Sequence, residues 1–150
     1  MQKSILILSL LILSASLCGC GSEVSSQSTF KEKFTIGTIV EDNAQYLIPG
    51  PRELFGSEYG LSEPFTQKQE EIVFQIEPVD LPAFFTVIRS GIEESIIGSG
   101  ASIVGQGSGG VTGTSFSIQY RANEVYGTIN VWGVRGEGTT YTLIVLITES

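Results

Sequence analysis

The sequence predicts an α+β fold in which one main helix packs on a mostly antiparallel sheet of four to five strands. Two observations support this. Between Asp80 and Ile97 apolar residues recur every three or four positions, as on one face of a helix. Between Phe116 and Thr148 they alternate with polar residues in three runs joined by short turns, which predicts a C-terminal three-strand meander.

The first part of the domain has the weakest pattern. Residues 34–40 are rich in β-branched side chains and predict a strand, which Gly37 weakens. We expect one helical turn within residues 52–60 and a loop over residues 61–69. From Glu71 onward apolar and polar residues alternate, which predicts a strand that buries one face. The buried side chains would be those of Ile72, Phe74 and Ile76.

The main helix has recognisable ends. Asp80 is a suitable N-cap residue, Pro82 is tolerated in the first turn, and Gly98 is a suitable C′ residue after the last turn. Gly91 in the interior should cost about 1 kcal/mol relative to Ala. The apolar face consists of Leu81, Phe84, Phe85, Ile88, Ile92 and Ile96.

A glycine-rich stretch follows the helix. It predicts one short strand, Ala101–Gly105, and a loop over residues 106–110. Gly98-Ser99-Gly100 invites comparison with a phosphate-binding loop, but such a loop precedes its helix and meets the helix N-terminus. Here the helix comes first, so we interpret the stretch as a connecting loop.

The meander comprises strands at residues 116–121, 125–134 and 139–148, with turns at residues 122–123 and 135–138. The last strand carries apolar side chains on both faces. This is typical of a central strand covered on each side.

Composition excludes several classes of function. The 150 residues include 16 acidic and 8 basic side chains and no histidine, giving a formal net charge of −8. The acidic balance disfavours nucleic-acid binding, which needs Lys and Arg to neutralise phosphates. Without histidine, the usual Ser-His-Asp and Cys-His machinery and His-ligated zinc are absent. We therefore expect no metal and no cofactor.

The N-terminus has the form of an export signal. Lys3 precedes an apolar run from Ile5 to Leu17, which is a typical length for a signal-peptide core. A membrane-spanning helix needs about 20 apolar residues, and this run is shorter. The alternatives are an uncleaved membrane anchor and ordinary secretion with cleavage at another small residue.

Leu17-Cys18-Gly19-Cys20 ends this run and resembles the lipobox of bacterial lipoproteins. The resemblance implies cleavage between Gly19 and Cys20 and attachment of a diacylglyceryl group to the Cys20 sulfur. The protein would be exported and held on a bacterial membrane by lipid, without crossing it. Because Gly21 follows, the resemblance favours the outer membrane in a cell with two membranes, and otherwise the outer face of the cell membrane.

The sequence thus divides into three parts. Residues 1–19 form the cleaved signal, and residues 20–29 form the lipidated cysteine with a flexible tether of small and polar residues. Residues 30–150 form a single domain, which contains no cysteine and must be stabilised by its core.

Candidate sites within the domain are few. The adjacent acids Glu41-Asp42, Glu70-Glu71 and Glu93-Glu94 should diverge from one another and be solvated, and no residue is assigned a catalytic role. Trp132 and Tyr126, on one face of the same strand, form a possible partner surface, because aromatic residues supply much of the binding energy in interfaces. The pattern gives more weight to the alternative in which Trp132 faces the core or the N-terminal segment.

These observations favour a non-enzymatic binding or accessory module anchored in the cell envelope, with a protein or another envelope component as its partner. One alternative is an envelope hydrolase that uses Asp or Glu carboxylates, although no feature selects which two. A purely structural role is the other alternative.

Overall fold

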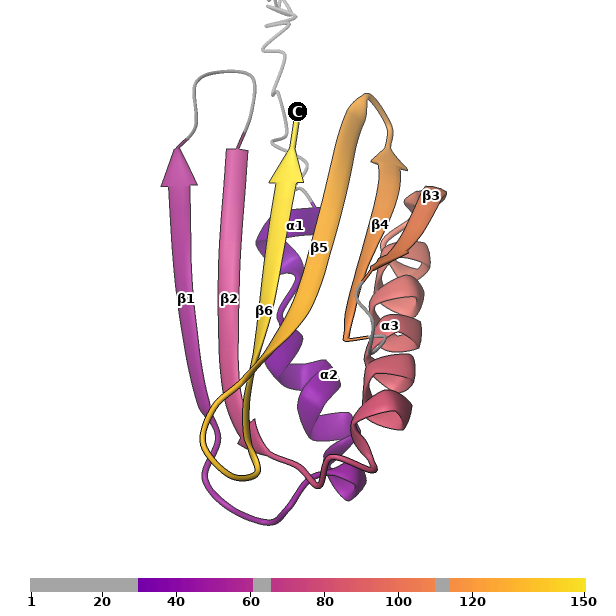
Figure 1. The fold of residues 1–150 in the computed structure, drawn as a ribbon. Coiled ribbons are helices and arrows are strands. Elements are labelled where there is room, and N and C mark those ends of the chain that lie inside the picture. Colours follow the sequence, from indigo (N-terminus) through magenta and orange to yellow (C-terminus); the bar gives the residue numbers. More distant parts are fainter. Residues whose placement is uncertain (1–29, 61–65, 110–113) are drawn as a thin grey trace, which may run out of the picture.

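The computed structural model describes residues 30–60, 66–109 and 114–150 (Figure 1). The predicted signal peptide, the predicted lipidation and cleavage positions Cys20 and Gly19, and the predicted tether lie outside the described residues. The helices are α1 (Phe30–Lys33), α2 (Ile36–Asp42), a 3-10 turn (Ala44–Tyr46) and α3 (Leu81–Gly98). The strands are β1 (Glu53–Gly60), β2 (Thr66–Gln75), β3 (Ser102–Gly109), β4 (Ser115–Ala122), β5 (Val125–Arg135) and β6 (Thr140–Glu149).

The strands form one antiparallel sheet in the order β1-β2-β6-β5-β4-β3. The expected fold class is therefore wrong in its sheet: there are six strands instead of four to five, and the described chain is mostly β, with one long helix. The last strand, β6, lies between β2 and β5. Figure 1 shows the helices on one side of this sheet only, so the prediction that both faces are covered is also wrong for the described residues.

Two N-terminal elements are the reverse of the prediction. Residues 34–40, expected as a strand, lie mostly in α2, because Ile36, Ile39 and Val40 are spaced to bury one helical face. Residues 53–60, expected to include a helical turn, form β1 at the edge of the sheet. Its residues 53–56 are all exposed, so this half of β1 has no alternating burial that a sequence pattern could reveal.

The glycine-rich stretch is also more regular than expected, because β3 continues to Gly109 through the predicted loop. A β-carbon at Gly105 would lie 2.6 Å from Gln119 Oε1, and one at Gly107 would lie 2.8 Å from Ser117 Oγ. The glycines therefore allow β3 to lie closely against the side chains of β4. The prediction of a loop at residues 106–109 is therefore wrong, because these residues belong to strand β3.

The apolar face predicted for α3 is confirmed, since all six of its residues are buried against the sheet. The helix ends differ in detail. The Asp80 side chain makes no capping hydrogen bond, and Gly98 is the last helical residue. The left-handed residue comes at Gly100, where φ is +86°. Among the described residues, no helix is both long and apolar enough to cross a membrane.

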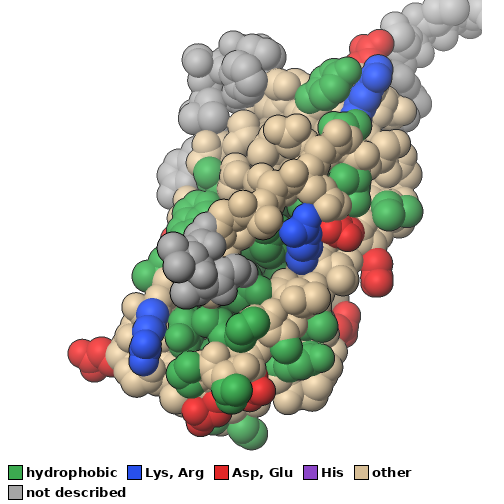
Figure 2. Space-filling model, turned by 45° about the vertical axis from the view of Figure 1, so that its right-hand side comes forward, with side chains coloured by type: hydrophobic (Ala, Val, Ile, Leu, Met, Phe, Trp, Pro, Cys, Tyr) green, Lys and Arg blue, Asp and Glu red, His purple; other side chains and the backbone are tan. Residues whose placement is uncertain are grey.

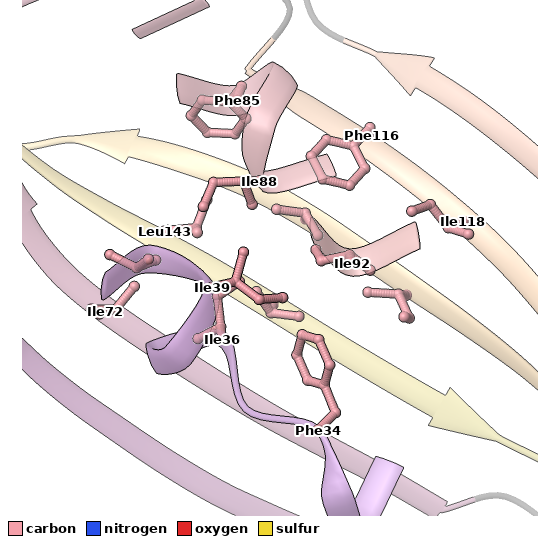
Figure 3. Packing of buried hydrophobic residues seen from close by; sticks show 14 of the residues in the cluster. Phe34, Ile36, Ile39, Ile72, Phe85, Ile88, Ile92, Phe116, Ile118 and Leu143 are labelled. Carbon is pink, nitrogen blue, oxygen red and sulfur yellow. The ribbon is translucent and has the colours of Figure 1, made fainter. Parts of the chain in front are cut away.

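Gly91 of α3 has a packing role that offsets its low helix propensity. A β-carbon there would lie 2.6 Å from Ile39 Cγ2, so α2 crosses α3 at the point where α3 has no side chain. Figure 3 shows Ile39, Ile88 and Leu143, from α2, α3 and β6, pointing into the same space between the helices and the sheet. Gly91 thus allows the two helices to share one core.

The N-terminal helices are fixed to the sheet by charged side chains on β2. The backbone N–H of Ile36, at the start of α2, donates to Glu70 Oε2 over 2.7 Å. Lys68 Nζ donates to the Phe34 carbonyl over 2.6 Å and lies 3.0 Å from Glu70 Oε1. Glu70 is buried, so this pair joins the link between α1 and α2 to the sheet through charge-assisted hydrogen bonds.

A second buried carboxylate, at the end of β6, holds α1. Glu149 is 3% exposed, and its Oε1 accepts from the Lys31 backbone N–H over 3.1 Å and from the Tyr120 hydroxyl over 2.5 Å. Burial, followed by the hydrogen bond to Glu149, raises the pKa of Tyr120 well above its usual value near 10. The folded state therefore requires the neutral phenol.

We expect Gly91→Ala to destabilise the protein, although Ala has the higher helix propensity. The added methyl must displace Ile39, which should cost about 1–3 kcal/mol of unfolding free energy and exceed the gain of about 1 kcal/mol in propensity. Urea denaturation measures the difference. Gly98→Ala is the matched control, because no atom lies within 4 Å of its added β-carbon. Equal or greater stability of Gly91→Ala would contradict the close crossing.

We expect Tyr120→Phe to alter the dependence of stability on pH. Tyr120 keeps its proton in the folded state, whereas the unfolded chain releases it near pH 10, so its contribution is present below about pH 10 and is lost as pH rises further. At neutral pH the variant should lose about 1–3 kcal/mol, because Glu149 loses a donor. Above about pH 10 its stability should fall less steeply than that of the unaltered chain. Urea denaturation at both pH values measures this, with Tyr126→Phe as the exposed control; equal pH slopes for the two variants would refute the assignment.

Candidate functional site

The sheet has one face without described helices, which we call the open face. Residues paired across neighbouring strands share a face, and the residues that alternate with the buried ones point to this side. On the four central strands they are Gln67, Gln69, Glu71, Val73 and Gln75 of β2; Thr140, Thr142, Ile144, Leu146 and Thr148 of β6; Tyr126, Thr128, Asn130, Trp132 and Val134 of β5; and Ser115, Ser117, Gln119 and Arg121 of β4.

Trp132 lies near the middle of the open face and does not point into the core between helices and sheet. It is half-buried, and it pairs with Ile144 on the neighbouring strand β6 and with Ser115 on the neighbouring strand β4. Leu146 and Val73, also half-buried, extend the apolar surface around it. The apolar residues on both faces of the last strand are the sequence signal for this surface. They predict a second covering layer, but the described helices cover only the other face.

Tyr126 shares the open face with Trp132 but does not adjoin it. Six residues along one strand separate their backbones by about 20 Å. Tyr126 is 52% exposed, and the Arg121 guanidinium lies 5.2 Å from its ring centroid. The two predicted partner residues thus mark different parts of one surface.

A shallow depression of about 300 Å³ lies beside Trp132. Asn130 also lines it, and its remaining lining includes Gly107, Ser115 and Ser117 on β3 and β4. Because these side chains are small, the backbone is accessible next to the indole. The open face is therefore hollowed at this edge, beside the half-buried Trp132.

The open face is poor in charge. On its four central strands only Glu71 and Arg121 are charged, and Glu71 accepts a hydrogen bond from Gln69 over 2.5 Å. The whole chain carries 16 acidic residues. Figure 2, which turns the side of the molecule at the right of Figure 1 forward, shows hydrophobic side chains gathered over the lower half of the view, with a few Lys, Arg, Asp and Glu side chains among and around them. The open face thus combines apolar and neutral polar side chains, as in the centre of a protein interface.

A second concave region lies on the opposite side of the molecule, between the N-terminal helices and α3. This groove, of about 570 Å³, is lined in part by Phe34 and Ile39 and by the charged residues Lys33, Asp42 and Glu94. Its size is within the usual range for small-molecule sites. Asp42 and Glu94 are far apart in the sequence but line the same groove, and no sequence pattern predicts this.

The adjacent acids diverge, as predicted, but they are not all solvated. In the first pair, Glu41 pairs with Arg52 over 2.6 Å, and this hydrogen bond lowers the pKa of Glu41. In the second pair, Glu70 is buried beneath the helices, whereas Glu71 lies on the open face. The sequence does not predict burial of Glu70, because one of its partners is the backbone N–H of Ile36, in a segment expected to be a strand.

Glu93, from the third pair, bonds to Arg89 over 3.1 Å, whereas Glu94 lines the groove. Within the part of the chain that the structure describes, no three His, Cys, Asp or Glu residues lie close enough together to hold a metal ion.

No protein-family model matches the chain, and no curated protein matches it in sequence. The function must therefore be inferred from the residues and their geometry.

Proposed function

We propose that the protein is a lipid-anchored, non-enzymatic binding or accessory module of the bacterial cell envelope, and that its open face binds the partner. The observation that carries this proposal is the half-buried Trp132 within a charge-poor, helix-free sheet face. Such a face leaves apolar area in contact with water, and covering it with a partner is favourable.

The place of the tether supports this arrangement. The Lys31 backbone bonds to Glu149, so the tether joins the domain at the end of the sheet where β6 finishes. The tether that the sequence predicts over residues 20–29 would reach roughly 17 Å on the scaling for Gly/Ser-rich linkers. A tether attached at this end of the sheet leaves the open face accessible to a partner.

A hydrolase is the second candidate, and one observation favours it. Asp42 and Glu94 line the same groove, and two carboxylates can act as general acid and base on a bound substrate. We give priority to the open face because Trp132, Ile144 and Leu146 form a continuous apolar surface there.

The experiment that tests the binding role is crosslinking in the native cell. A photoreactive amino acid at Thr142, on the open face, should yield adducts with a partner, because a bound partner covers this position. The same photoreactive group at Ser90, an exposed residue on the outer side of α3, is the matched control and should yield no adducts. Adducts are detected by mass shift on denaturing gels. Equal labelling at both positions, or none at Thr142, would overturn the binding role.

Two further variants separate the alternatives in the same assay. Asp42→Asn with Glu94→Gln should leave the Thr142 adducts unchanged, and their loss would favour the groove. Cys20→Ser should abolish incorporation of labelled palmitate and release the protein from the membrane fraction. Continued incorporation would refute the anchor.

A further inference from the structure

We propose that the occupant of the open face is a second copy of this chain, packed face to face as a symmetric dimer. This rests on the proposed function, in which the open face is the binding surface, and it names the partner. The argument uses the charge of the face, its area and the order of residues across it.

Charge restricts where two copies can meet. Each chain carries a formal net charge of −8, so two copies repel wherever acidic surfaces approach. The open face is where this repulsion is weakest, because Glu71 is the only acid on its four central strands, and Arg121 lies on the same face. The edge strand β1 adds Glu53, which pairs with Val73 and so shares this face. Glu71 is already bonded to Gln69 and Glu53 lies at the edge of the sheet, so the two acids leave no like-charge cluster at the centre.

The area of the open face matches that of a stable interface. A strand of ten residues, such as β6, is about 34 Å long, and the five spacings between six strands add about 24 Å of width. Their product is about 800 Å², which is the area that a standard-sized interface buries on each partner.

The order of residues along one row of the sheet is self-complementary. Register places Glu71, Ile144, Trp132 and Ser115 side by side across β2, β6, β5 and β4. Consider a twofold axis that lies between the two packed faces, parallel to the strands and level with the gap between β6 and β5. Rotation about this axis reverses the order of the row in the second copy. Trp132 then faces Ile144, and Glu71 faces a serine hydroxyl instead of another carboxylate. The row thus matches itself without pairing like charges.

The anchor selects the same axis. Both copies must direct the Phe30 end of the domain toward one membrane, and only an axis along the strands keeps these two ends together. Confinement to a membrane also raises the effective concentration of one copy near another, as linking two binding partners does. Two lipid anchors per dimer would hold the assembly more firmly than one.

The test uses the full-length protein in its native membrane and a short bismaleimide crosslinker. Asn130→Cys places a thiol beside the proposed axis, on the open face, and should give a product of twice the chain mass. Ser90→Cys on α3 is the matched control and should give at least about tenfold less. The unaltered chain is treated in parallel, since it measures any product formed through Cys18 or Cys20.

A charge variant tests whether the product reflects packing of the face. Thr128→Glu, combined with Asn130→Cys, places two like charges near the axis and should reduce the product at least about fivefold. Its urea denaturation should match that of Asn130→Cys alone; if it does not fold, Thr148→Glu on β6 replaces it. Product that persists undiminished in the folded variant would overturn the dimer.

The outcomes distinguish this inference from the proposed function. No dimer product from Asn130→Cys, with Thr142 adducts of other masses still present, overturns the dimer and leaves the binding role standing. Equal product from Asn130→Cys and Ser90→Cys also overturns it, because proximity alone would then explain the crosslinks. Product from Asn130→Cys that Thr128→Glu reduces at least about fivefold supports the dimer.

Discussion

The structure depends on two buried carboxylates that hold the N-terminal helices on one face of the sheet. Glu70 bonds to the first backbone N–H of α2, and Glu149 bonds to a backbone N–H of α1. Helix N-termini carry partial positive charge and unsatisfied donors, so a buried carboxylate is stabilised there. Lys68 completes the arrangement by bonding to the Phe34 carbonyl and pairing with Glu70. These bonds determine that α1 and α2 pack beside α3.

Placing the helices together on one face has a consequence for the other. The inner face of β6 is buried, while its outer face, with Ile144 and Leu146, is only half-buried. Apolar side chains in contact with water are unfavourable in an isolated domain, and covering them stabilises a domain that associates with a partner. Charge depletion around Trp132, in a strongly acidic chain, suits the same use. The proposed binding role and the proposed dimer both follow from this asymmetry.

Sequence patterns predicted the elements whose burial is regular. The apolar face of α3 follows from spacings of three and four residues, and the C-terminal strands follow from a period of two. The interior place of β6 follows from apolar residues on both of its faces. The prediction failed where residue type and spacing disagree. Ile36 and Val40 favour a strand by type, but with Ile39 they are spaced to bury one helical face, and Glu70 bonds to the first N–H of that helix. Trp132 was identified by residue type, but the face it occupies depended on where the helices lie.

The most direct test of the account is the hydrogen-exchange rate of the Ile36 amide in the folded protein. First-turn amides of a helix normally exchange rapidly, because they have no partner within the helix. The bond to buried Glu70 should slow exchange at Ile36 at least about tenfold relative to the unstructured chain. The Ala83 amide, in the first turn of α3, is the comparison. Exchange of Ile36 at the rate of an unstructured chain would contradict the claim that Glu70 fixes the helices to the sheet.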